Sequence, residues 1–99
     1  MVFDGTWQVS IATPIGKQSV VLEISTENGL IRGTARQGAE TVDFVEPVAE
    51  GKRLTWSQTI TKPMSMRLKF DVTVEENRMN GTAKAGFFPA STLTGERVN

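Results

Sequence analysis

Apolar and polar residues alternate along most of the chain, and this alternation constrains the fold more than any other feature of the sequence. Successive side chains of a β-strand point to opposite faces, so alternation predicts strands with one buried face. No convincing run of apolar residues at the helical spacing i, i+3, i+4 and i+7 competes with it. The sequence therefore predicts an all-β protein. The alternating apolar positions are Trp7, Val9, Ile11, Val20, Leu22, Ile24, Leu54, Trp56, Met66, Leu68, Phe70, Val72 and Val74.

Composition and turn residues favour the same class. Val, Ile and Thr contribute 27 of the 99 residues, against 5 Leu and 7 Ala, and branching at Cβ favours the pleated sheet over the helix. Turn-forming Gly, Pro and Asn recur at the ~8–12-residue spacing of short strands joined by tight turns. These short connections predict an antiparallel meander. We expect eight strands, at 4–13, 18–27, 30–37, 40–47, 52–62, 65–75, 78–85 and 89–98.

The chain also resembles itself at a long interval. The pattern of residues 6–14 returns at 55–63, and that of residues 33–38 returns at 81–86. We interpret the two matches as a duplicated four-stranded unit. Four twisted strands leave open edges and an uncovered apolar face, whereas eight strands can close and remove both.

The predicted fold is therefore an eight-stranded antiparallel up-and-down barrel, and the alternative is a sandwich of two four-stranded sheets. The length suits a single domain spanning 1–99, with internal repeats at about 5–50 and 54–98.

Two tight turns predict which residues face each other inside the barrel. The turn at 28–29 sets Ile24 opposite Gly33 and Leu22 opposite Ala35, and the turn at 76–77 repeats this arrangement. In the second hairpin the pairs are Val72 with Gly81 and Phe70 with Ala83. The small residues leave room that either the two tryptophans or a ligand fills. On the outer face, Glu23 with Arg32 and Arg36, and Asp71 with Lys84, are expected to form solvated pairs.

The residues Gly5-Thr6-Trp7 resemble the G-x-W signature of lipocalins, which avidins and fatty-acid-binding proteins share in looser form. These calycin families typically add an arginine near the end of the last strand, packed over that tryptophan, and Arg97 supplies a candidate. The resemblance implies a small ligand-binding barrel with Trp7 and Arg97 at its closed base. Trp56, which the repeat places in correspondence with Trp7, is expected to be a further structural residue there. The family's ligand is not carried over to this chain.

The two ends of the predicted barrel differ in polarity. The connections at 27–29, 49–52 and 75–77 are polar and acidic, whereas those at the other end are apolar. Exposed apolar clusters on a protein mark a ligand portal or a partner contact. The alternative is that these loops fold inward and cap their own barrel, and that the methionines fill the core. The candidate contact residues are Ile15, Met64, Met66, Phe87 and Phe88.

The sequence offers few tools for catalysis. It has no His, Cys or Tyr, so the usual nucleophile–base pairs and the imidazole or thiolate ligands of metals are missing. We assign no catalytic residue, no metal site and no cofactor. A barrel can still shape an apolar substrate for isomerisation or cyclisation, and Glu40, Asp43 and Glu46 are the candidates for proton transfer there.

Three functions follow from these observations. The first is a small soluble barrel that binds an apolar or amphipathic small molecule at its apolar loop end. The alternative is a solid-cored module that contacts another protein or forms a homo-oligomer, and the minor alternative is a cofactor-free isomerase or cyclase. Eleven basic and eleven acidic residues cancel, so neither nucleic acid nor an anionic membrane is an expected partner. No signal-peptide pattern opens the sequence, which makes the cytoplasm the expected location.

Overall fold

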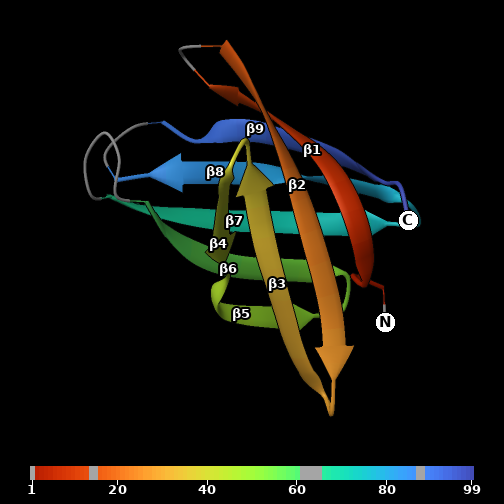
Figure 1. The fold of residues 1–99 in the computed structure, drawn as a ribbon. Helices are drawn as coiled ribbons and strands as arrows, with labels where there is room; N and C mark the ends of the chain where they lie inside the picture. The colour runs from red at the N-terminus through yellow and green to blue at the C-terminus, as the bar shows by residue number, and fades with distance from the viewer. Residues whose placement is uncertain (1, 14–15, 61–65, 87–88) are drawn as a thin grey trace.

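The structure is a computed structural model of the 99-residue chain, and it describes residues 2–13, 16–60, 66–86 and 89–99. Within these ranges the chain forms one antiparallel sheet in the order β4-β3-β2-β1-β9-β8-β7-β6-β5 (Figure 1). This sheet curls into a small, nearly closed barrel, so the prediction of an all-β antiparallel barrel is confirmed and the two-sheet alternative is not. The described strands are β1 (Gly5–Thr13), β2 (Gly16–Glu27), β3 (Leu30–Gln37), β4 (Glu40–Asp43), β5 (Val45–Glu50), β6 (Arg53–Ile60), β7 (Met66–Glu75), β8 (Arg78–Ala85) and β9 (Ser91–Arg97).

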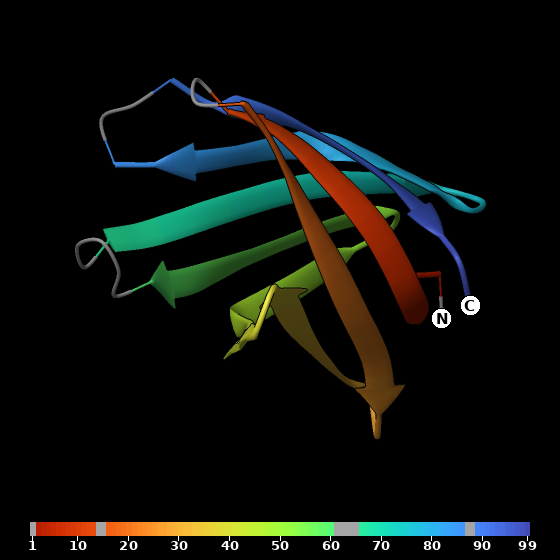
Figure 2. The same cartoon turned by 45° about the horizontal axis from the view of Figure 1, so that its top comes forward.

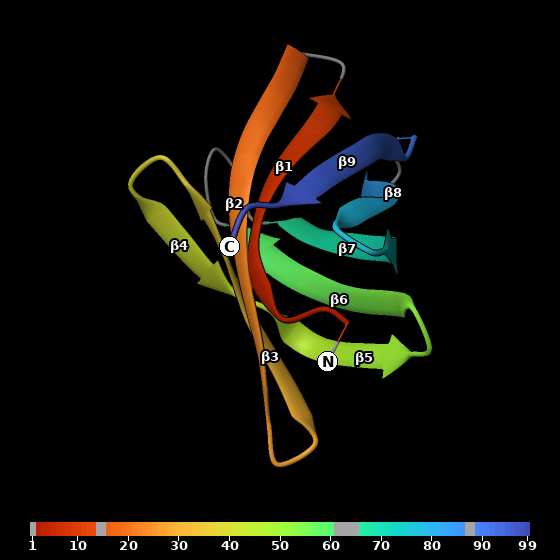
Figure 3. The same cartoon turned by 90° about the vertical axis from the view of Figure 1, so that its right-hand side faces the viewer.

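The barrel closes where the chain passes from β4 to β5. These two strands are the outermost strands of the sheet, yet only Phe44 separates them in the sequence. The backbone N–H of Phe44 donates to the carbonyl oxygen of Gly33 at 2.9 Å, which continues the pairing of β4 with β3. From Val45 onward the chain pairs with β6 instead. Figure 3 shows β4 and β5 leading away from each other on opposite sides of β3.

The predicted strand 40–47 is therefore wrong as a single element, and the structure describes nine strands rather than eight. The physical reason is a change of pairing partner accompanied by a β-bulge. The register of β5 against β6 shifts between Val45 and Val48, and Glu46 has a φ of 48°. Pro47 lies within this bulge, where its missing N–H costs no ladder hydrogen bond.

Strand register follows the two predicted tight turns. In the hairpin of β2 and β3, Ile24 lies opposite Gly33 and Leu22 lies opposite Ala35. In the hairpin of β7 and β8, the corresponding pairs are Val72 with Gly81 and Phe70 with Ala83. These pairings, which the two turns predicted, are confirmed, whereas the duplication of a four-stranded unit stays a prediction. Figure 2 shows β1 and β2 crossing over the strands of the other half of the sheet.

The inward faces of both halves meet in one hydrophobic core. Alternate residues of each strand enter it, as the period of two requires. The predicted inward direction of Leu22, Ile24, Phe70 and Val72 is confirmed, because all four are buried. The core comprises Phe3, Trp7, Val9, Ile11, Val20, Leu22, Ile24, Ala35, Phe44, Leu54, Trp56, Phe70, Val72, Val74, Met79 and Leu93.

Three aromatic rings form a stack inside the barrel, from the junction of β4 and β5 to β6 and β7. The ring centroids of Phe44 and Trp56 lie 4.2 Å apart, and those of Trp56 and Phe70 lie 4.9 Å apart, with interplanar angles of 8° and 5°. Phe44 also covers Gly33, where an added Cβ would lie 2.3 Å from the Phe44 ring. The space beside Gly33 is therefore filled by Phe44, and at Gly81 the backbone of β7 occupies the corresponding position.

On the outer face, the predicted pairing of Asp71 with Lys84 is corrected by the structure. Asp71 accepts two hydrogen bonds from Arg53, from Nε at 2.9 Å and from Nη2 at 2.6 Å. Lys84 instead lies opposite Lys69 across β7 and β8. The hydrogen bonds and the positive charge of Arg53 keep the pKa of the Asp71 carboxyl below its ordinary value.

Replacing Gly33 with Ala tests the close contact with Phe44. We expect Gly33→Ala to lower the free energy of unfolding by about 1–3 kcal/mol, because the new methyl group displaces a ring that is packed against Trp56. In a Phe44→Leu background the same substitution should cost clearly less. Urea denaturation of the four proteins in this cycle measures the difference. An equal cost in both backgrounds would contradict the proposed contact.

The ion pair of Asp71 gives a prediction about pH. Because its pKa is lower in the folded state, this carboxylate contributes stability above its ordinary pKa, and the contribution is lost as the pH falls through the folded pKa. We expect Arg53→Gln to raise the Asp71 pKa toward the ordinary value of about 3.9. An NMR titration of the carboxyl carbon measures it. Lys84→Gln is the control and should leave the Asp71 pKa nearly unchanged. A rise of this pKa in Lys84→Gln but not in Arg53→Gln would support the pairing of Asp71 with Lys84 that the sequence predicted.

Candidate functional site

A cavity of about 320 Å³ occupies one half of the barrel interior. Its wall comes from the last residues of β1, β3 and β6 and from the first residues of β2, β4, β7 and β9, so it lies toward the end that the sequence marked as apolar. The described residues that line it are Val9, Ile11, Val20, Leu22, Ala35, Gln37, Glu40, Val42, Gln58, Leu68, Phe70 and Leu93.

The wall of this cavity is mostly apolar. Nine of its twelve described lining residues carry apolar side chains, and the volume falls near the lower end of the ~300–1,000 Å³ range of small-molecule sites. Ala35 is the smallest side chain in the wall, and it lies opposite Leu22 across β2 and β3. The space that the sequence predicted beside small inward residues is therefore present next to Ala35. Neither tryptophan is among the described residues that line it.

Gln58 is the buried polar residue of the wall, with 6% of its surface exposed. It follows Leu54 and Trp56 on the inward face of β6. Its Oε1 accepts a hydrogen bond of 2.9 Å from the indole Nε1 of Trp56. The other two polar groups are more exposed, because Gln37 ends β3 and Glu40 begins β4. Gln37 Nε2 donates to Gln18 Oε1 at 2.7 Å.

The opposite end of the barrel is closed by the N-terminal residues. Phe3 is 2% exposed and Trp7 is fully buried. The indole Nε1 of Trp7 donates to the carbonyl oxygen of Phe3 at 2.9 Å. The guanidinium carbon of Arg97 lies 4.5 Å from the centre of the Trp7 ring, a cation–π distance. Trp7 and Arg97 also lie opposite each other in the register of β1 and β9.

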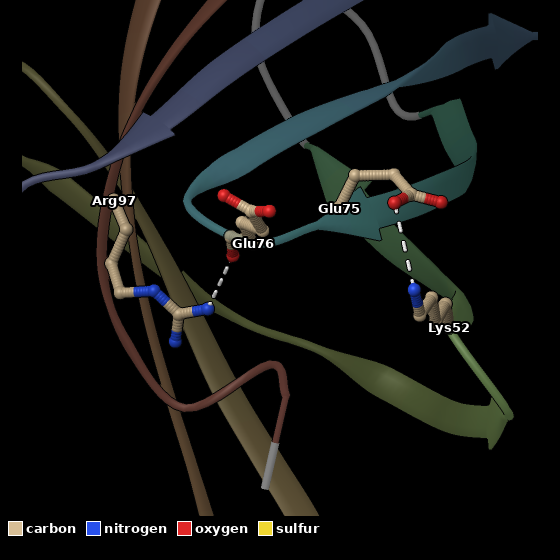
Figure 4. A network of polar contacts seen from close by, with 4 residues as sticks. All are labelled: Lys52, Glu75, Glu76 and Arg97. Atoms are coloured by element: carbon tan, nitrogen blue, oxygen red, sulfur yellow. Dashed lines mark hydrogen bonds and ion pairs between the residues drawn. The ribbon is translucent and has the colours of Figure 1, made fainter.

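Arg97 connects three parts of the chain at this base. Its Nε donates to Asn77 Oδ1 at 3.0 Å, and its Nη2 donates to the carbonyl oxygens of Val2 and Glu76, each at 2.8 Å. Its Nη1 donates to the carbonyl oxygen of Asp4. Figure 4 shows the bond to Glu76 together with an exposed ion pair nearby, between Lys52 and Glu75 at 3.5 Å. The base is therefore closed by packing and by hydrogen bonds, and the cavity lies at the other end.

The candidate contact residues from the sequence fall largely outside this description. Ile15, Met64, Phe87 and Phe88 lie outside the described residues. Met66 begins β7, where its backbone pairs with Ile60. Their role therefore stays a prediction.

Trp56, expected at the base, belongs to the aromatic stack. It lies one inward position beyond Leu54 on β6, between Phe44 and Phe70. Because Phe70 also lines the cavity, the stack forms part of the cavity boundary.

Sequence reasoning missed three residues that shape this interior. Phe3 precedes the predicted first strand, and Phe44 lies inside a strand that was expected to be continuous. Gln58 is a polar residue at an inward position, where the alternating pattern predicts an apolar one. A signal was available for Gln58: it shares the parity of Leu54 and Trp56, so the alternation itself places a polar side chain in the interior.

The carboxylates considered for proton transfer do not converge. Glu40 lines the cavity, whereas Asp43 and Glu46 line separate hollows on the outside of the barrel. Among the described residues, no group of three or more acidic side chains lies close enough to bind a metal ion. The described ranges also contain no helix that is long and apolar enough to cross a membrane.

The base gives a prediction about stability. We expect Arg97→Lys to lower the free energy of unfolding by about 1–3 kcal/mol, because an ammonium group keeps the charge but cannot reach all the acceptors around the guanidinium. Chemical denaturation measures the change. The control is Arg36→Lys, at an exposed position of β3, which should be nearly neutral. Equal effects at the two positions would show that the hydrogen bonds of Arg97 contribute little.

No protein-family model and no curated protein matches this sequence. A solved structure of a redesigned β-barrel is similar, with 12% sequence identity and a TM-score of 0.78. The match covers 99% of this chain and 93% of that chain. At this identity the likeness shows the fold alone, a small antiparallel β-barrel, and membership of a calycin family stays a prediction.

Proposed function

We propose that this barrel binds a compact, mostly apolar small molecule in the cavity between the aromatic stack and the apolar end. The observation that carries the proposal is the difference between the two ends of the interior. Phe3, Trp7 and Arg97 close one end, and the other contains a cavity of 320 Å³ with a mostly apolar wall. A molecule that transfers its apolar surface from water to this wall gains binding free energy in proportion to the area buried.

The cavity lowers the stability of the folded protein, so its presence suggests a function. Protein interiors are normally packed as densely as organic crystals, and unfilled volume lowers stability. A larger side chain at Ala35 would fill part of the space without touching the strand pairing, since Ala35 projects inward from a regular ladder. The retained volume therefore favours a binding site over a packing defect.

The position of the polar groups favours an amphipathic ligand. Gln37 and Glu40 lie on neighbouring strands where β3 ends and β4 begins, and both are exposed. A ligand can therefore bury its apolar body among the aliphatic side chains and keep a polar group near these two residues. This arrangement supports the small-molecule function over the solid-cored alternative, because the core contains a cavity toward the apolar end of the barrel. It gives less support to the enzyme, because Glu40 is the sole carboxylate among the described lining residues.

Filling the cavity tests the proposal. We expect the wild-type protein to bind at least one of three probes, ethylbenzene, acetophenone and 1-hexanol, with shifts confined to amide signals around the cavity in ¹H–¹⁵N NMR spectra. Ala35→Leu should lower the affinity by about ten-fold or more, because the added atoms occupy the ligand's space.

The same variant should not lower the free energy of unfolding, because it fills a void. Ala12→Leu is the matched control, since Ala12 is exposed on the outer face of β1 near the same end. It should leave binding unchanged. The proposal fails if none of the three probes shifts the cavity signals of the wild-type protein, or if both variants affect binding equally.

A further inference from the structure

Gln58 stands out in the cavity wall as a polar side chain where an aliphatic one would pack. The inward residues of β6 are Leu54, Trp56 and Gln58, and none of them is more than 6% exposed. A buried amide costs free energy unless its donors and acceptor find partners. The Oε1 of Gln58 has such a partner in the buried indole N–H of Trp56, and that bond leaves the two N–H donors of its Nε2 to be accounted for.

The hydrogen bond from Trp56 fixes which way this amide faces. An indole N–H can only donate, so the atom 2.9 Å from it must be the carbonyl oxygen of Gln58 and not the amide nitrogen. Trp56 is itself held between Phe44 and Phe70 in the stack. In the part of the chain that the structure describes, no hydrogen bond uses Gln58 Nε2. No enclosed side-chain nitrogen of the described residues lacks a partner, so the unused Nε2 is open to the cavity that Gln58 lines.

The charges around the cavity limit what this donor can bind. None of the described lining residues is basic, and Glu40 is the one charged residue among them. A carboxylate or phosphate ligand would lose its hydration without gaining a cation, and it would approach the negative charge of Glu40. A neutral oxygen acceptor carries no such penalty. Gln58 is therefore matched to a carbonyl oxygen.

We propose that Gln58 Nε2 donates a hydrogen bond to a neutral carbonyl oxygen of the ligand, so that the cavity selects compact apolar ketones, esters or amides over hydrocarbons of the same shape. This inference rests on the proposed binding function and makes Gln58 its specificity-determining residue. A donor whose orientation is fixed before binding loses little conformational freedom when the ligand arrives.

The test compares acetophenone with ethylbenzene, which has a similar shape but no oxygen acceptor. Isothermal titration calorimetry gives both dissociation constants for the wild-type protein and for Gln58→Met, whose side chain is of similar length but has no N–H. The preference for acetophenone over ethylbenzene should fall about three- to ten-fold in the variant, as expected for one lost hydrogen bond. Unchanged binding of ethylbenzene shows that the variant keeps its cavity.

Gln8→Met is the matched control, because it makes the same change at an exposed position on the outer face of β1, away from the cavity. It should leave the preference unchanged. The infrared carbonyl stretch of bound acetophenone should lie at lower frequency in the wild-type protein than in Gln58→Met. An equal preference in wild type and Gln58→Met, with both compounds bound, overturns the role of Gln58 and leaves the binding function intact. Absence of binding of both compounds to the wild-type protein overturns both proposals.

Discussion

The change of pairing partner at Phe44 is the constraint on which the barrel depends. A single stretch of chain pairs first with β3 and then with β6, and only this exchange brings the two edges of the sheet together. The same residue connects the halves through its side chain, because its ring covers Gly33 and stacks on Trp56. Phe44 therefore takes part both in the closure of the backbone and in the aromatic stack. Any change that moves this ring affects both.

This closure also divides the interior. On one side of the stack, Phe3 and Trp7 fill the barrel and Arg97 connects the N-terminal residues to β9 and to the turn between β7 and β8. On the other side the walls stand apart around the cavity. A barrel whose base is packed and hydrogen bonded can tolerate unfilled volume at its other end, because stability is not spread evenly over a structure. The packing and hydrogen bonds at the base thus offset the stability that the cavity costs at the other end.

Much of the strand pattern could be predicted from the sequence, because a period of two leaves little freedom about which residues face inward. The turn at 28–29 was enough to place Leu22 opposite Ala35. The sequence could not show the break at Phe44, because a strand changes partners where the whole sheet happens to close. Nor could it show that Asp71 pairs with Arg53, since exposed long side chains have several neighbours within reach. The cavity itself follows from how the halves meet, which no local pattern contains.

Gln58 and Ala35 together argue that the cavity is more than a gap left by imperfect packing. A larger residue at 35 would bury more apolar surface without disturbing the strand ladder. At 58 an apolar residue would leave the amide nitrogen out of the cavity wall, and among the described residues only the amide oxygen has a partner, in Trp56. Unrelated packing defects would be scattered through a core, but these two departures from dense apolar packing line the same cavity. Departures from local consistency are expected where function demands them. Their coincidence connects the volume, which Ala35 leaves open, to the donor, which Gln58 supplies, as two parts of the binding site that we propose.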